Sequence, residues 1–121
     1  MAEETVNGVK LLVLDANGVL LSSEADALDV IGQTYGLDVD AVIVPASRFA
    51  PAFFQLSTTL AGLFIQKFQN YRLRLIVLGD IARAVSESQA LADFVRETNR
   101  TGHHLFVTDR AELADRLRDT R

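Results

Sequence analysis

The sequence predicts an α/β fold in which a mixed five-stranded sheet, opened by an antiparallel hairpin, packs against about four helices. Three observations predict it. The 121 residues are 49% hydrophobic and 23% charged, the composition of one globular domain. Short apolar runs of strand length alternate with longer segments in which apolar residues recur at helical spacing. An Asn-Gly pair stands between two apolar runs near the start, which is the strongest short-range hairpin signal.

The expected elements alternate regularly after the hairpin. One opening hairpin followed by right-handed crossovers implies parallel strands packed against helices. In chain order, we expect strands over residues 9–16 and 19–21, a helix over 22–36, a strand over 41–45, a helix over 57–71, a strand over 73–78, a helix over 88–99, a strand over 104–108 and a short helix over 109–117.

The first two strands are expected to pair as the hairpin. The strand over residues 9–16 contains four consecutive apolar residues, as a strand covered on both faces would. Both residues of a two-residue hairpin loop take positive φ, which Asn17 and Gly18 tolerate. The domain is expected to span residues 1–121, with about 1–8 and 119–121 frayed at the ends.

Capping residues mark where helices begin. Ser23 with Asp26 forms a capping box before the first helix, and Asp109 with Glu112 forms another before the last. The strand over residues 41–45 ends at a proline, where ladder pairing can stop.

The second helix is apolar on more than one side, because Leu60 and Leu63 lie off its main apolar stripe. We therefore expect Leu60 and Leu63 to form the face of a homodimer. The Phe-rich segment 49–56, which includes Phe53 and Phe54, precedes this helix. It would add exposed apolar surface, unless it folds over its own core and hides the same residues.

Composition and charge exclude several classes of function. Lys and Arg total 12 against 16 Asp and Glu, a net charge of -4, so neither nucleic acid nor a membrane is an expected partner. The absence of cysteine excludes a disulfide framework and a thiolate site. No apolar stretch is long enough to span a bilayer and the start is acidic, so the cytoplasm is the expected location. No cofactor and no metal is expected, and adjacent His103 and His104 would form a surface pair.

Several stretches carry a resemblance to known families. They lie at residues 14–23, 53–58, 60–62, 66–75, 79–80 and 93–99. These stretches resemble the bacterial domain-of-unknown-function family numbered 4180 over nearly the whole chain. The element order is similar to that of STAS (sulfate transporter and anti-sigma factor antagonist) domains, which also run from a hairpin through alternating helices and strands. The numbered family brings no assigned activity with it.

The STAS resemblance implies a non-enzymatic regulatory or protein-interaction domain. In regulatory STAS proteins a partner kinase phosphorylates a serine at the start of the second helix, and Ser57, Thr58 and Thr59 occupy that place. The free N–H groups and the dipole of a helix N-terminus favour an anion there. The same hydroxyls would also serve as an ordinary helix cap.

The alternative is a small-molecule-binding protein or a small cofactor-independent enzyme. Polar residues gather on the last turns of the second helix, and Asn70 and Tyr71 are not strong helix formers, which favours another role for them. A pocket between the Phe-rich segment 49–56 and this helix would be lined by Phe53, Phe54, Gln66, Lys67, Asn70, Tyr71 and Arg72.

Three aspartates, Asp15, Asp80 and Asp109, each follow an apolar strand. Ligands of open α/β sheets collect beyond strand carboxyl ends, and three carboxylates could hold a divalent cation. Turn formation and helix capping explain the same residues and are the favoured interpretation. The stretch from Asp15 also resembles the haloacid-dehalogenase nucleophile motif, but Asn17 stands where the acid/base Asp is needed, and an amide cannot relay a proton.

Overall fold

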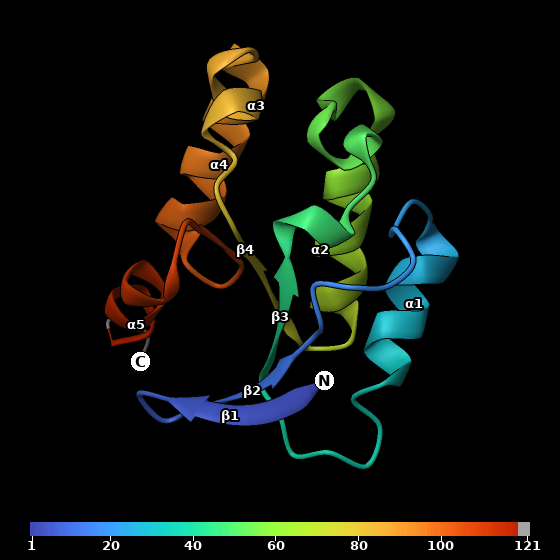
Figure 1. Cartoon of the computed structure of the whole chain (residues 1–121), viewed down its shortest axis with the longest axis vertical. Helices are drawn as coiled ribbons and strands as arrows, with labels where there is room; N and C mark the ends of the chain where they lie inside the picture. Colours follow the sequence, from blue (N-terminus) through green and yellow to red (C-terminus); the bar gives the residue numbers. More distant parts are fainter. Residues whose placement is uncertain (119–121) are drawn as a thin grey trace.

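A computed structural model describes residues 1–118 as a five-stranded sheet with helices on both faces (Figure 1). The strands lie side by side in chain order, and the first is antiparallel while the others are parallel. This confirms the predicted mixed sheet. The strands are β1 (Ala2–Val6), β2 (Val9–Val13), β3 (Ala41–Pro45), β4 (Arg74–Leu78) and β5 (Leu105–Val107).

The opening hairpin lies one strand earlier than the sequence analysis placed it. Its loop is formed by Asn7 and Gly8, whose φ angles of 48° and 83° are those of a hairpin turn with both residues at positive φ. The segment 1–8, expected to be frayed, therefore contains the edge strand. Residues 119–121, the other end expected to fray, lie outside the described residues.

The second Asn-Gly pair, at residues 17–18, is held in a loop instead of a hairpin. The Arg48 guanidinium donates from Nε and Nη2 to the Val19 carbonyl oxygen, each at 3.2 Å. A Cβ on Gly18, whose φ is 153°, would lie 2.7 Å from Arg48 Cζ. The expected strand over residues 19–21 is thus wrong, because a contact from a distant residue fixes the loop.

Helices cover the two faces of the sheet unequally. Those on the first face are α1 (Glu24–Gly32), α2 (Leu60–Asn70) and α4 (Gln89–Thr101), while the second face has α5 (Arg110–Arg118). A short α3 (Ala82–Ser86), absent from the prediction, lies between β4 and α4. Three 3-10 turns connect β3 to α2, namely η1 (Ala46–Arg48), η2 (Pro51–Phe54) and η3 (Leu56–Thr58).

The two faces carry separate cores because successive strand residues point to opposite sides. Leu12, Val42 and Leu75 pack on the first face, and Leu11, Ala41 and Ile76 on the second. No helix within residues 1–118 is long and apolar enough to cross a membrane.

The hairpin and the last helix meet beside the second face. Asn7 Nδ2 donates to the Ala114 carbonyl oxygen at 2.7 Å, and the Arg110 guanidinium lies 2.7 Å from a Glu4 carboxylate oxygen. The first and last elements of the described chain therefore hold each other over this core.

The predicted capping box at Ser23 is present, whereas at Asp109 the cap is present and the return bond of Glu112 goes to the residue before the cap. Ser23 Oγ accepts from the Asp26 N–H at 3.2 Å, and the Asp26 carboxylate accepts from the Ser23 N–H at 3.1 Å. Asp109 accepts from the Glu112 N–H at 2.9 Å, and the Glu112 carboxylate accepts in return from the preceding Thr108 N–H at 2.7 Å.

Candidate functional site

A hollow of about 960 Å³ lies at the carboxyl edge of the parallel strands, and it is called the cleft here. Its floor is formed by Leu78 and Gly79, where β4 ends. One wall comes from the segment 46–57 and the other from α3 with the start of α4. In Figure 1 these two walls stand at the top of the molecule, beyond the tips of the strands. Ligands of open α/β sheets bind at this edge.

A close backbone approach fixes the floor of the cleft. Gly79 has a φ of 153°. A Cβ on Gly79 would lie 2.8 Å from the Cβ of Ala46, the residue at which the wall formed by the segment 46–57 begins. Only glycine fits both the conformation and the space. Asp80 follows, and its Oδ1 accepts from the Ala82 N–H at 2.9 Å, which caps the first turn of α3.

The cleft is mainly apolar and carries little charge. Its charged side chains are Asp80, Arg83 and Glu87. Arg83 Nε lies 3.2 Å from a Glu87 carboxylate oxygen, so these two charges offset each other. The remaining lining is apolar apart from serine and glutamine side chains, and includes Pro51, Phe54, Leu56, Ile81 and Ala84.

The pocket expected between the Phe-rich segment and α2 is filled by aromatic rings. Phe49 stacks on Phe53 with ring centroids 3.8 Å apart, and both meet the Phe64 ring of α2 edge-on at 5.4 and 5.6 Å. Phe53 is completely buried, so its assignment to a pocket lining is wrong. Phe54 is half-buried and lines the cleft, on the other side of the segment.

The three candidate hydroxyls have different surroundings. Thr58 Oγ1 lies within hydrogen-bond distance of the Ala52 and Gln55 carbonyl oxygens, at 2.6 and 2.8 Å, and so holds the turn together. Thr59 takes a left-handed φ of 63° and makes no side-chain cap to α2. Ser57 is exposed and lies on the cleft wall.

The polar residues of α2 do not form one site with the Phe-rich segment, although Gln66 lines a surface hollow together with Leu56 of that segment. An 11-residue helix is about 16 Å long, and the aromatic rings of the segment meet its first turns, whereas Asn70 is its last residue. Lys67 Nζ lies 3.4 Å from a Glu24 carboxylate oxygen of α1. The remaining residues of the cluster are exposed at the far end of the helix, namely Asn70, Tyr71 and Arg72.

A second hollow, called the groove here, runs between α2 and α4 with a volume of about 440 Å³. Its lining consists of Leu56, Thr59, Gly62, Leu63, Gln66 and Phe94. Leu63 is half-buried at this surface. Leu60 is only 7% exposed because the chain's own core covers it, so its placement on an exposed face is wrong. Leu56 also lines the cleft, so the two hollows are neighbours.

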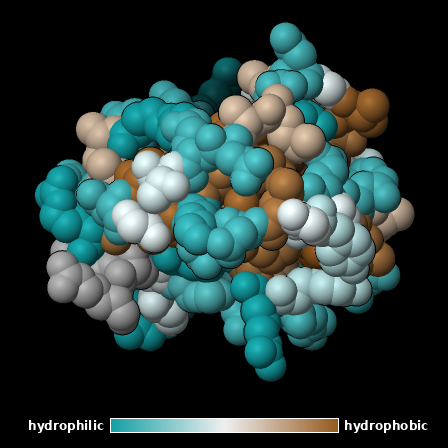
Figure 2. All heavy atoms as spheres, turned by 90° about the horizontal axis from the view of Figure 1, so that it is seen from below, coloured by the Kyte–Doolittle hydropathy of each residue, from teal (hydrophilic) through white to brown (hydrophobic). Residues whose placement is uncertain are grey.

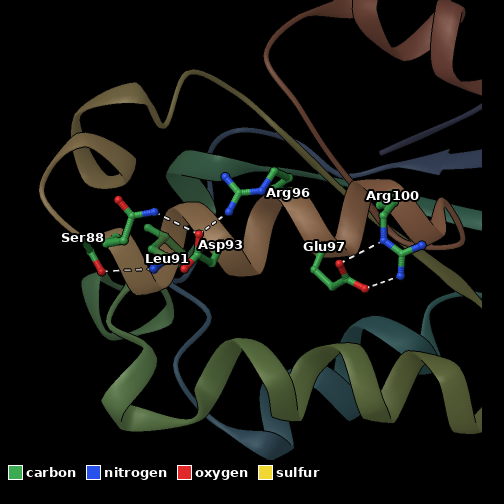
Figure 3. Close-up of polar contacts among 7 residues, drawn as sticks. Ser88, Leu91, Asp93, Arg96, Glu97 and Arg100 are labelled. Atoms are coloured by element: carbon green, nitrogen blue, oxygen red, sulfur yellow. Dashed lines mark hydrogen bonds and ion pairs between the residues drawn. The ribbon is translucent and has the colours of Figure 1, made fainter.

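The exposed side of α4, the helix that contributes Phe94 to the groove, carries several charged side chains (Figure 3). Hydrogen bonds from Gln89 and Arg96 hold the pKa of Asp93 below its ordinary value. The Glu97 carboxylate accepts from Arg100 Nε at 3.0 Å, which likewise lowers the pKa of Glu97. These side chains pair along the helix and remain exposed.

Only one of the two adjacent histidines lies on the surface. His104 is buried at the amino-terminal edge of the sheet, where Nδ1 accepts from the Leu75 N–H at 2.9 Å and Nε2 lies 3.1 Å from Gln69 Oε1. The ring is therefore neutral with its proton on Nε2. Burial, together with the charges of His103 and Arg74, lowers the pKa of His104 to about 4. The expected surface pair is wrong for this residue. Figure 2 looks onto this edge of the molecule, which is mostly hydrophilic around a small apolar centre.

The three aspartates that follow strands do not come together as a metal site. Asp15 accepts from the Met1 amino group at 2.7 Å, whereas Asp80 and Asp109 cap helices. Within residues 1–118 no group of three or more acidic or histidine side chains is placed to hold a metal ion.

The profile of one protein family, Domain of unknown function (DUF4180), matches residues 6–117. The chain belongs to this family. A search of curated proteins found no match, and neither did a search of solved structures. The DUF4180 match extends from the end of β1 into α5, so the cleft and the groove both lie within the family's region.

Sequence reasoning missed the α3 wall of the DUF4180 cleft. Arg83, Ala84 and Glu87 carry no motif, and they lie on or directly after a helix of five residues, none of them buried. The available signal was Asp80, which follows an apolar strand as site residues of open sheets do.

Proposed function

We propose that this DUF4180 domain is a non-enzymatic regulatory or protein-interaction domain of STAS-like architecture. In this proposal a protein partner, or a second copy of the chain, docks over the groove between α2 and α4. The observation that carries it is the half-buried side chains of Leu63 and Phe94, which face a groove beside the exposed Ser57. The order of elements, a hairpin and then alternating helices and strands, supports the STAS-like part.

The groove has the make-up of a docking surface. Its centre is formed by apolar residues of two helices, Leu63 from α2 and Phe94 from α4. Asp93 and Arg96 form an exposed ion pair on α4, the helix that contributes Phe94 (Figure 3). An apolar centre with a polar rim is the usual anatomy of a protein interface.

Of the three candidate phosphorylation sites, Ser57, Thr58 and Thr59, Ser57 is best suited to regulation. It is exposed, whereas Thr58 is engaged with backbone carbonyls of its own turn. A phosphate on Ser57 would add nearly two negative charges next to Leu56, which lines both hollows. Thr59 lines the groove itself and provides an alternative acceptor.

The surroundings of the ionisable groups favour binding over catalysis. In the cleft, Arg83 pairs with Glu87 and Asp80 caps α3, so each has a structural use. Both histidines lie at the opposite edge of the sheet. A cytoplasmic location belongs to this proposal.

Leu63→Glu is expected to weaken docking, because it would bury a charge in the interface. Its effect on folding should be small, because the Leu63 side chain is half exposed in the free domain. Native mass spectrometry and sedimentation velocity of the protein purified from its host should show a bound protein or a second copy. The substitution should weaken that complex at least about tenfold.

Leu28→Glu is the matched control, since Leu28 is 38% exposed on α1 and outside the groove. It should leave the complex intact. A wild-type protein that sediments as a bare monomer would contradict the proposal, as would a complex that survives Leu63→Glu. Phosphate mapped to Ser57 in the same preparation, together with weaker docking by Ser57→Asp than by Ser57→Ala, is expected for a phosphorylation switch.

A further inference from the structure

We propose that the cleft binds a small molecule with an apolar body and a single cationic or hydrogen-bond-donating group, which Asp80 receives. This site is separate from the docking groove, and the proposal does not depend on the proposed function.

The size and lining of the cleft suit a small organic ligand. Its volume of about 960 Å³ lies at the upper end of the roughly 300–1,000 Å³ found for such sites. Side chains approach from three sides, with Leu78 as the floor, Phe54 and Leu56 on one wall and Ile81 and Ala84 on the other. Mostly apolar lining with few polar groups is typical of small-molecule pockets.

The charge distribution selects the polar group of the ligand. Of the three charged side chains in the lining, Arg83 and Glu87 offset each other at 3.2 Å. Asp80 therefore carries the remaining charge of -1 in the lining. Its Oδ1 accepts from the Ala82 N–H, which leaves Oδ2 to accept from a ligand. An anionic group would meet this carboxylate with no unpaired cation to offset it, so a cation or a neutral donor fits better.

The α3 wall is suited to adjust around an occupant. This helix has five residues and buries none of them, so few packing contacts oppose its movement. The opposite wall is anchored by the aromatic cluster around Phe53. Because Leu56 lines both hollows, an occupied cleft would also fix one residue of the docking surface.

The test uses three probes that share a ten-carbon chain: decylammonium, decanol and decanoate, each below its micelle concentration. Amide NMR spectra of the full chain are recorded as each probe is added. Decylammonium is expected to shift the amides of Phe54, Ile81 and Ala84, and to bind at least tenfold more tightly than decanoate, with decanol between them.

Two variants and one control decide the assignment. Asp80→Asn keeps the cap of α3, because asparagine caps helices as well as aspartate does, and it should remove the preference for decylammonium over decanoate. Ala84→Trp fills the cleft from a helix without buried residues and should weaken all three probes at least tenfold. Asp29→Asn changes an exposed acid on α1, outside the cleft, and should change nothing.

The proposal is overturned if no probe shifts the cleft amides. It is equally overturned if decanoate binds as tightly as decylammonium, or if Ala84→Trp leaves binding unchanged. Failure of Leu63→Glu to disrupt docking would not bear on these results, because the groove and the cleft are probed by different residues and different ligands.

Discussion

Replacing Phe53 by alanine is expected to lower the free energy of unfolding by about 4 kcal/mol, the usual cost of removing a fully buried ring without refilling its space. Phe53 has no exposed surface and contacts the rings of Phe49, Phe64 and Phe106. It joins the segment 46–57 to α2 and the sheet, so its loss should also loosen the wall of the cleft. Urea unfolding followed by circular dichroism measures the change.

Phe54→Ala is the matched control for this experiment. The neighbouring ring is half-buried and faces the cleft, so its removal should cost only about 1.5 kcal/mol. The same residue should contribute to ligand binding, whereas the effect of Phe53→Ala should be mainly on stability. Equal losses of stability in the two variants would show that the aromatic cluster does not anchor the segment as described.

The unfolding free energy is also expected to fall by about 3 kcal/mol between pH 7 and pH 4 because of His104. In the unfolded chain this imidazole takes up a proton near its ordinary pKa of 6.5, whereas in the folded protein its pKa is about 4. Between these values the unfolded state binds more protons, so acid favours unfolding. Protonation of Nδ1 would remove the acceptor of the Leu75 N–H.

His104→Asn removes the titration while keeping an acceptor for the Leu75 N–H, and it should flatten most of this pH dependence. His103→Asn changes the exposed neighbour and should retain most of it. Urea midpoints at several pH values compare the two variants with the parent chain. If the decline of stability is as steep in His104→Asn as in the parent, other groups are responsible for it.

The fold class could be predicted from the sequence because its signals are local. Helix caps such as Ser23 and Asp109, and apolar runs such as residues 41–45, depend on neighbours along the chain. The hairpin was misplaced because the chain contains two Asn-Gly pairs. The two pairs differ in a tertiary contact, because Arg48 binds the loop around Gly18. The residues near Gly18 in the sequence give no sign of that contact.

The candidate site was less predictable because it depends on how distant segments meet. The sequence indicated that the Phe-rich segment and the residues around Ser57 matter, but not which side of the segment would remain open. Packing of Phe53 against α2 closes one side and leaves the cleft on the other. Likewise, the sequence favoured a surface position for His104, because it does not show that α2 places Gln69 within hydrogen-bond distance of this ring.

The contact between Asn7 and Ala114 has a consequence for synthesis of the protein. The residues that meet are 107 positions apart, and the second core they help to close includes Leu11, Ile43 and Leu113. During translation the strands leave the ribosome with that side uncovered, and it stays uncovered until α5 has emerged. Folding of this face is therefore delayed until α5 has been synthesised, and a chain stopped before Arg110 would expose an apolar sheet surface prone to self-association.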